Sequence, residues 1–248
     1  MFRGAFRLFR FAGIQVFLHW SWFILAYFEV RSFAHRYWNP IWAVGEFLAL
    51  FAIVLAHEFG HALACRSAGG KAERIVLWPL GGLAFVEPPP RATALLWSIA
   101  AGPLVNAVLF PALSLLVWMM IQTHHVPHQA AIIRADAYTF SLGLFGMNAA
   151  LLVFNLLPIY PLDGGQILRA LLWFPLGEIR SLKITSVVGM IGALGLGAMA
   201  IWWSSIWIGI IAFFIFTQAG AAIQRAKVLA LEADTALPVT GVPPEPQV

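Results

Sequence analysis

The dominant pattern along the chain is a series of long apolar runs separated by short polar or proline-containing segments. Several runs extend for about 20 residues or more with almost no charge, which is the length that a helix needs to cross a bilayer. The pattern therefore predicts an all-α polytopic membrane protein with six transmembrane helices. The predicted spans are residues 12–30, 41–65, 92–121, 138–157, 184–203 and 205–223.

Composition supports the same class of protein. Of the 248 residues, 61% are hydrophobic and only 10% are charged, whereas soluble domains carry about 25% charged residues. The formal net charge of +4 could suggest a nucleic-acid partner, but a basic excess is also typical of the segments that flank membrane spans. We therefore expect a lipid bilayer around the chain and no nucleic acid, and the single Cys65 excludes an internal disulfide.

The distribution of basic residues predicts the orientation. If the N-terminus is cytoplasmic and six spans alternate, all but Arg31, Arg36 and Arg134 of the 15 Lys and Arg residues fall on the cytoplasmic side. This asymmetry follows the positive-inside rule and places both termini in the cytoplasm. The predicted organisation is a basic N-terminus at 1–11, a membrane domain at 12–223 and a flexible proline-rich tail at 224–248.

One segment between the second and third spans has a different pattern. Residues 75–86, "IVLWPLGGLAFV", contain two short apolar runs around Gly81 and Gly82. Two such runs joined through paired glycines indicate a β-hairpin. We therefore expect a short membrane-associated hairpin beside the helices.

The second apolar run contains the pattern H-E-x-x-H, with His57, Glu58 and His61. On a helix, side chains four residues apart share a face about 6 Å apart, so both imidazoles can reach one metal ion. Zinc suits imidazole ligands and is expected at one ion per chain, and Glu58 can accept a proton from water and pass it to a leaving amine. The alternative is that the histidines only hydrogen-bond within the bundle, but ionisable groups inside a membrane are usually functional.

A third ligand is expected from Asp163, which follows the fourth span in an irregular segment. Pro158 and Pro161 interrupt the helix there, and Gly164 and Gly165 allow the backbone to approach other groups closely. Irregular backbone at membrane depth occurs where it is buried or lines a wet cavity. The alternative reading of Asp163 is an ordinary helix N-cap.

These motifs together resemble the site-2 protease family of intramembrane zinc metalloproteases. The resemblance implies that His57, His61 and Asp163 bind zinc, that Glu58 is the general base and that Asn155 holds substrate near the metal. It also implies that the hairpin lies by the active site, with Gly81, Gly82, Leu83 and Ala84 as its substrate-binding residues. The motifs that carry it are "HEFGH" (57–61), "NLLPIYPLDGG" (155–165), "PLGGLA" (79–84), "AGPLVN" (101–106) and "FLHWSW" (17–22).

The sequence therefore predicts an intramembrane zinc endopeptidase that cleaves membrane-anchored proteins within or near their transmembrane segments. By resemblance, the setting is regulated proteolysis in a bacterial cytoplasmic membrane, with room for a regulatory partner that the sequence does not identify. Two other classes stay open: a metal transporter, which would have little use for Glu58 as a base, and an inactive scaffold, which would not need an intact H-E-x-x-H and Asp163.

For the remaining polar residues in and between the spans, we expect structural rather than catalytic roles. Glu46 shares a helix face with His57 and is expected to lie at the membrane interface rather than in a hydrated cavity. His19 is expected to be a packed or hydrogen-bonded residue of the bundle, and Asn106 a polar contact between helices. His124, His125 and His128 are expected to lie in a solvated loop rather than to bind metal.

Overall fold

The structure, a computed structural model, describes residues 4–78, 81–122 and 128–235. The chain begins with two strands, continues through two helices and a second pair of strands, and ends in five helices. In chain order the elements are β1 (Ala5–Phe11), β2 (Ile14–His19), α1 (Ser21–Ala34), α2 (Ile41–Ser67), β3 (Lys71–Trp78), β4 (Gly81–Glu87), α3 (Ala92–Gln122), α4 (His128–Leu156), α5 (Asp163–Leu176), α6 (Glu178–Trp202) and α7 (Ile206–Thr235).

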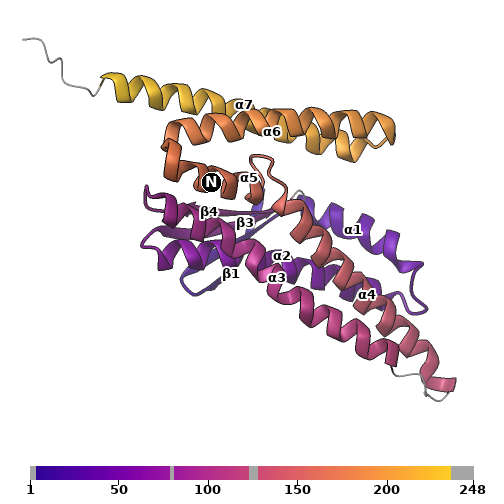
Figure 1. Cartoon of the computed structure of the whole chain (residues 1–248). Helices are drawn as coiled ribbons and strands as arrows, with labels where there is room; N and C mark the ends of the chain where they lie inside the picture. The colour runs from indigo at the N-terminus through magenta and orange to yellow at the C-terminus, as the bar shows by residue number, and fades with distance from the viewer. Residues whose placement is uncertain (1–3, 79–80, 123–127, 236–248) are drawn as a thin grey trace, which may run out of the picture.

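The long helices form two groups on either side of the sheet (Figure 1). Helices α2, α3 and α4 run away from the sheet as one bundle, α6 and α7 form an antiparallel pair on the opposite side, and the short α5 lies between the two groups. Within the described residues, five helices are long and apolar enough to cross a membrane, namely α2, α3, α4, α6 and α7. The chain is thus an integral membrane protein built mainly from helices.

The predicted first span at residues 12–30 is wrong. Residues 14–19 form strand β2, and the helix that follows, α1, has only 14 residues. At 1.5 Å per residue α1 is about 21 Å long, which is shorter than the roughly 30 Å hydrocarbon layer. The prediction failed because a buried strand and a helix can both present a continuous apolar run, and no turn residue separates them here.

The predicted hairpin is present, but it belongs to a larger sheet, so the prediction of an all-α fold needs correction. Strands β3 and β4 pair antiparallel, with Val76 opposite Leu83 and Trp78 opposite Gly81. Strand β2 adds to β3 in parallel, β1 adds to β2 antiparallel, and the order is β1-β2-β3-β4. The two N-terminal strands leave β4 as a sheet edge beside the helices.

One face of the sheet packs against α2. Ile14 and Val16 of β2 and Ile75 and Leu77 of β3 point to this face, where they meet α2 residues such as Ala62. All five side chains are nearly inaccessible to solvent. Burial of each large aliphatic side chain is worth about 1.5–3 kcal/mol, so this contact fixes the sheet against the helix that carries H-E-x-x-H.

The other predicted spans are helical, with shifted ends. Helix α3 continues through Pro103 and Pro111. Helix α7 extends to Thr235, so the first part of the predicted flexible tail at 224–248 is helical instead, because its side chains, such as Ala226, pack against α6. Residues 236–248 of that tail lie outside the described residues.

Two glycines of α6 make room for the loop that precedes α5. A Cβ atom at Gly189 would lie 2.5 Å from the Tyr160 carbonyl oxygen, and one at Gly192 would lie 2.7 Å from the Ile159 side chain. The segment that precedes Asp163 therefore rests directly on the α6 backbone. Glycine is required here because any side chain would push that segment away.

A buried polar network closes the other end of the bundle. Glu46 is completely buried, accepts a hydrogen bond from the Tyr37 hydroxyl at 2.7 Å and pairs with Arg36 at 3.2 Å. Glu46 lies five residues after the start of α2, and the residues that precede α2 fold back over it, so it is shielded by protein; its position at the membrane interface stays a prediction. Burial and the Glu46 carboxylate raise the pKa of the Tyr37 phenol, so it remains a donor.

We expect Gly143→Ala to destabilise the protein, because the added Cβ would lie 2.1 Å from Glu46 Oε1. The loss should be about 1–3 kcal/mol, as is usual for overpacking a buried site. A matched control is Gly146→Ala on the same helix, where nothing lies within 4 Å of the added Cβ. Thermal unfolding in detergent should show a lower midpoint for the first variant and an unchanged or higher one for the second; equal midpoints would contradict the packing of Glu46 against α4.

Candidate metal centre

Three side chains from two helices converge at one point. The His57 and His61 Nε2 atoms are 3.1 Å apart, and Asp163 Oδ2 lies 3.1 Å from the first and 3.4 Å from the second. Both histidines are buried, and the Asp163 side chain is only 13% exposed. Among the described residues, this is the one group of three His, Cys, Asp or Glu side chains that could hold a metal ion.

The hydrogen bonds of the two Nδ1 atoms determine which tautomer each histidine adopts and therefore what its Nε2 atom presents to the site. His57 Nδ1 lies 2.5 Å from Asn106 Oδ1, and His61 Nδ1 lies 3.0 Å from the Ser98 carbonyl oxygen. Both partners are acceptors, so each Nδ1 carries the proton and donates it. Each Nε2 then presents a lone pair toward the other and toward the Asp163 carboxylate.

A zinc ion fits this arrangement. Three acceptor atoms in mutual contact repel one another unless a cation lies between them, and Asp163 Oδ2 is buried without a hydrogen-bond partner. Ligand atoms about 2.0–2.1 Å from a tetrahedral zinc lie roughly 3.3 Å from one another, close to the spacing here. Gly102 leaves the necessary space, because a Cβ there would lie 2.3 Å from His61 Nε2. Two imidazoles and one carboxylate are also a known ligand set of catalytic zinc.

The chain brings Asp163 to the histidines through tight backbone packing. Asp163 is the first residue of α5, and the N-cap position is Leu162, so the N-cap alternative for the carboxylate does not hold. Cβ atoms at Gly164 and Gly165 would lie within 2.3 Å of the backbone of Leu156 and Tyr160. The expected close approach at these glycines is confirmed, and it turns the carboxylate back toward α2.

Glu58 lies between the metal site and the sheet. Its Oε2 atom accepts a hydrogen bond from the Ala84 backbone N–H at 3.0 Å, which requires that this N–H point away from β3. A Cβ at Gly82 would lie 2.2 Å from the Glu58 side chain. Glycine at position 82 therefore makes room for the carboxylate beside the strand edge.

A cavity of about 470 Å³ joins these groups. The metal-site residues, Glu58 and the β4 residues Gly82 and Ala84 line one side, and Asn155 lies on the wall as expected. Gly81 and Leu83 belong to β4, but their side-chain positions lie outside the described residues. Two polar residues that the sequence analysis missed, Gln166 of α5 and Gln218 of α7, also line the cavity.

The sequence analysis also missed Asn148, a fully buried residue of α4. Its Oδ1 atom accepts a hydrogen bond from Asn106 Nδ2 at 2.8 Å, and its own Nδ2 donates to the Asn106 carbonyl oxygen at 2.9 Å. Asn106 is thus the predicted polar contact between helices, and it also touches His57. An asparagine inside an apolar span was a visible signal, but its partner could not be named from sequence alone.

The remaining histidines lie apart from this site. His19 ends β2 rather than lying in a helical bundle, and its Nδ1 hydrogen-bonds with Ser21. His124 and His125 lie outside the described residues. His128 begins α4, and its side chain is likewise outside the described part.

Comparison with known proteins points to one family. The model of peptidase family M50 matches residues 45–135 and 117–199. The chain is 35% identical over 237 residues to a putative zinc metalloprotease, sll0528, of Synechocystis, covering 87% of this chain and 59% of that protein. It is 31% identical over 226 residues to the zinc metalloprotease MJ0392 of Methanocaldococcus jannaschii, covering 91% of this chain and 62% of that protein. The chain therefore spans about three-fifths of the length of these relatives.

Two further similarities extend the comparison. The chain is 38% identical over 126 residues to stage IV sporulation protein FB of Bacillus subtilis, covering 49% of this chain and 38% of that protein. Among solved structures, the site-2 protease from Methanocaldococcus jannaschii superposes with a TM-score of 0.60 at 30% identity, covering 88% of this chain and 95% of that one.

We expect Asn148→Leu to weaken zinc binding. The Asn106 amide would lose the acceptor that fixes its orientation, and its Oδ1 atom would then no longer hold the proton on His57 Nδ1. Loss of such outer partners typically lowers metal affinity 10–100-fold. The measurement is a competition titration of the purified protein with a zinc chelator. Ser141→Ala is the control, since this buried α4 hydroxyl donates within its own helix, to the Ala137 carbonyl oxygen; equal affinities in the two variants would contradict the role of Asn148.

Proposed function

The chain belongs to peptidase family M50, and from this premise we propose that it is an intramembrane zinc endopeptidase that hydrolyses peptide bonds within or near the transmembrane segments of membrane-anchored proteins. The observation that carries the proposal is the convergence of His57, His61 and Asp163 next to Glu58, in a cavity bounded by a strand edge. Zinc metalloproteases among the relatives support the reaction class.

The depth of the site supports a substrate inside the membrane. His57 lies 16 residues after the start of α2 at Ile41, which corresponds to about 24 Å of helix. Ser67 ends the helix ten residues later, about 15 Å farther on. A site at this position lies within the hydrocarbon layer, nearer to the sheet end of the molecule.

The proposed mechanism assigns one role to each group. His57, His61 and Asp163 would hold the zinc ion, which when bound supplies Lewis acidity that polarises a carbonyl and makes water more acidic. Glu58 takes the proton from the attacking water and delivers it to the nitrogen of the departing peptide, and the C–N bond breaks. Asn155 on the cavity wall holds the substrate backbone near the reacting carbonyl.

Strand β4 is the proposed substrate-binding edge. A transmembrane helix protects its peptide bonds with internal hydrogen bonds, so a segment must unwind before it can be cleaved, and in lipid its polar groups then need new partners. The outward N–H of Ala84, and the N–H two residues on at Val86, can bind an extended segment by strand addition. Gly81, Gly82 and Leu83 continue the same edge toward the tip of the hairpin.

We further propose that the sheet end of the molecule faces the cytoplasm and that both termini lie there. This orientation requires that α1 and the residues up to Pro40 carry the chain across the membrane in addition to the five long helices. The basic residues of the N-terminal strands, of the segments that follow α2 and α5, and of the C-terminal half of α7 fit this side under the positive-inside rule. The relatives named above come from two bacteria and an archaeon, which supports a prokaryotic membrane, and we propose the cytoplasmic membrane of a bacterium. A regulatory partner would act at these same surfaces.

We expect Glu58→Gln to abolish cleavage while zinc content stays at one ion per chain, because the amide cannot accept a proton but the ligands are intact. The rate should fall by about 10²–10⁴-fold. Purified protein is assayed for zinc and for cleavage of a model membrane-anchored substrate in liposomes. Glu73→Gln, an exposed carboxylate of β3, is the control; retained cleavage in Glu58→Gln would refute the mechanism, and zinc flux into the liposomes would favour a transporter.

We expect Val86→Pro to slow cleavage several-fold, because proline removes one outward N–H from the edge, and one hydrogen bond contributes about 0.5–1.5 kcal/mol. Val86→Ala shortens the same side chain but keeps the N–H. Both variants should retain zinc, since neither touches a ligand. The comparison is the rate of cleavage of the same substrate in both variants, and equal rates would contradict strand addition.

A further inference from the structure

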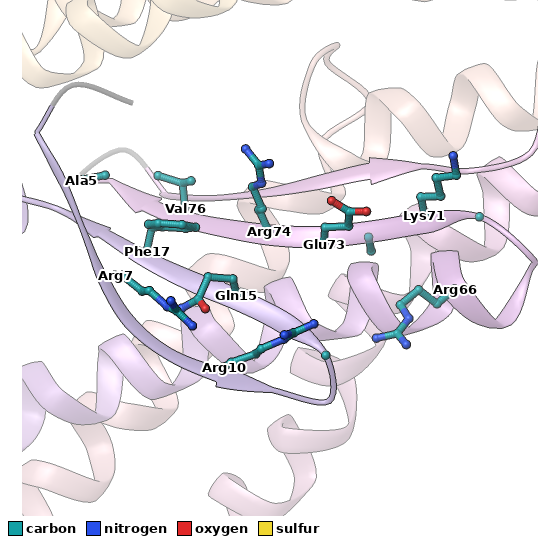
Figure 2. Close-up of a pocket in the computed structure, with 13 residues that line it drawn as sticks. Ala5, Arg7, Arg10, Gln15, Phe17, Arg66, Lys71, Glu73, Arg74 and Val76 are labelled. Carbon is teal, nitrogen blue, oxygen red and sulfur yellow. The ribbon is translucent and has the colours of Figure 1, made fainter. Parts of the chain in front are cut away.

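A second, larger cavity lies on the face of the sheet that points away from α2. It has a volume of about 880 Å³, and its walls come from β1, β2, β3 and the end of α2. Figure 2 shows Arg7 and Arg10 of β1 on one side, Arg74 and Lys71 of β3 on the other, and Arg66 at one end. None of these residues belongs to the metal centre or its cavity.

Basic side chains outnumber carboxylates in this basic pocket, although Glu87 of β4 stands opposite Lys71 in the register. Five basic side chains line it against one carboxylate, Glu73. In the described part of the chain, the Arg and Lys ion pairs lie elsewhere, between Arg36 and Glu46 and between Arg169 and Glu178. A smaller hollow nearby adds Glu87, but this residue belongs to β4, on the side of β3 away from β1 and β2.

Apolar side chains join the cations toward one end of the pocket. The register places Arg10, Gln15 and Arg74 in one row across the sheet, and Arg7, Phe17 and Val76 in the next row. Phe17, Val76 and Ala5 gather at the end opposite Arg66 and Lys71 (Figure 2). A site that combines several cations with apolar side chains matches an amphiphile better than a free anion.

The direction toward these apolar side chains matches the direction into the membrane. Arg66 stands one residue before the end of α2, at the proposed cytoplasmic surface. Val76 is adjacent to Ile75, whose partner Ala84 bonds to Glu58. Glu58 lies eight residues, or about 12 Å, deeper along α2 than Arg66. The arginines can reach back toward the surface along their apolar stems.

The outermost strand of the pocket is also suited to contact with lipid. Strand β1 carries exposed aromatic side chains, with Phe6 at 56%, Phe9 at 43% and Phe11 at 61% exposure. The register puts these phenylalanines on the face of β1 opposite to Arg7 and Arg10, so the strand has one basic face and one apolar face, as amphipathic elements at a membrane surface have. A purely aqueous anion site has no need of such a strand.

We propose that the basic pocket binds the phosphate headgroup of an anionic phospholipid of the cytoplasmic leaflet, with an acyl chain along Phe17 and Val76. Arginine forks bind phosphate oxygens with two parallel hydrogen bonds, and Arg10 and Arg74 stand across Gln15 in one row for this purpose. Such a lipid would fasten β1 and β2, and through them the hairpin, to the membrane surface. The proposal uses the orientation proposed above but not the protease activity, so each can fail without the other.

The test is native mass spectrometry of the full chain in detergent, titrated with phosphatidylglycerol and with phosphatidylcholine. We expect preferential retention of phosphatidylglycerol, and about 30-fold weaker binding at low salt in Arg10→Gln/Arg74→Gln, since each surface cation contributes about a factor of five. The matched control is Arg180→Gln/Lys183→Gln, which removes the same charge from exposed positions of α6. Arg10→Lys/Arg74→Lys should keep most of the preference and covers the case in which the glutamine variant does not fold.

Competitors identify the source of the phosphate. Dihexanoyl phosphatidylglycerol should bind more weakly than the dioleoyl form, because its chains are too short to cover the apolar end. Displacement of the dioleoyl lipid by millimolar inorganic phosphate or glycerol 3-phosphate would overturn the proposal and indicate a site for a free phosphate. Displacement by a polyglutamate peptide would overturn it and indicate a site for an acidic protein segment. Equal retention of phosphatidylglycerol in the Arg10/Arg74 and Arg180/Lys183 variants would contradict the proposal. It would mean that the cations of the pocket only help to orient the chain in the membrane.

Discussion

The rest of the structure depends on one constraint, the electrostatic repulsion among the lone pairs of the three predicted metal ligands. His57, His61 and Asp163 present acceptor atoms 3.1–3.4 Å apart at a largely buried site, where electrostatic repulsion is stronger than in bulk water. The helices stay in this arrangement because other interactions fix each ligand separately. Asn106 and the Ser98 carbonyl hold the rings, the sheet packs on α2, and the backbone around Gly164 and Gly165 holds Asp163.

A second constraint concerns the sheet, because an open edge is unusual at membrane depth. Unpaired backbone groups are costly in hydrocarbon, which is why lipid-exposed edges do not occur there. Here β4 faces a cavity and not lipid, and the N–H of Ala84 is bonded to Glu58. The base and the strand edge thus satisfy one another in the absence of substrate, and the glycine at position 82 allows the contact.

The parts of the site that could be predicted are those set by local periodicity. The spacing of His57 and His61 on one helix face needs no tertiary information, and Asp163 was identifiable because proline and glycine surround a lone acid. The first span was mispredicted because "FLHWSWFILAYF" is apolar throughout, although the alternation of Ile14, Gln15 and Val16 is the period of a strand. Asn148 and the burial of Glu46 were beyond reach, since each depends on which helices become neighbours. The contact of Gly189 and Gly192 of α6 with the loop before Asp163 was likewise beyond reach, because it depends on the tertiary arrangement.

The bond between Glu58 and the β4 backbone has a consequence for chemical selectivity. A hydrolytic centre inside a bilayer is surrounded by carboxylic esters, the acyl linkages of the lipids themselves, which are intrinsically easier to hydrolyse than amides. While Glu58 accepts the Ala84 N–H, its carboxylate is turned toward the strand and is less available as a base. An extended peptide that competes for that N–H would release Glu58 at the moment a peptide bond arrives, and a lipid ester, having no strand to offer, would not.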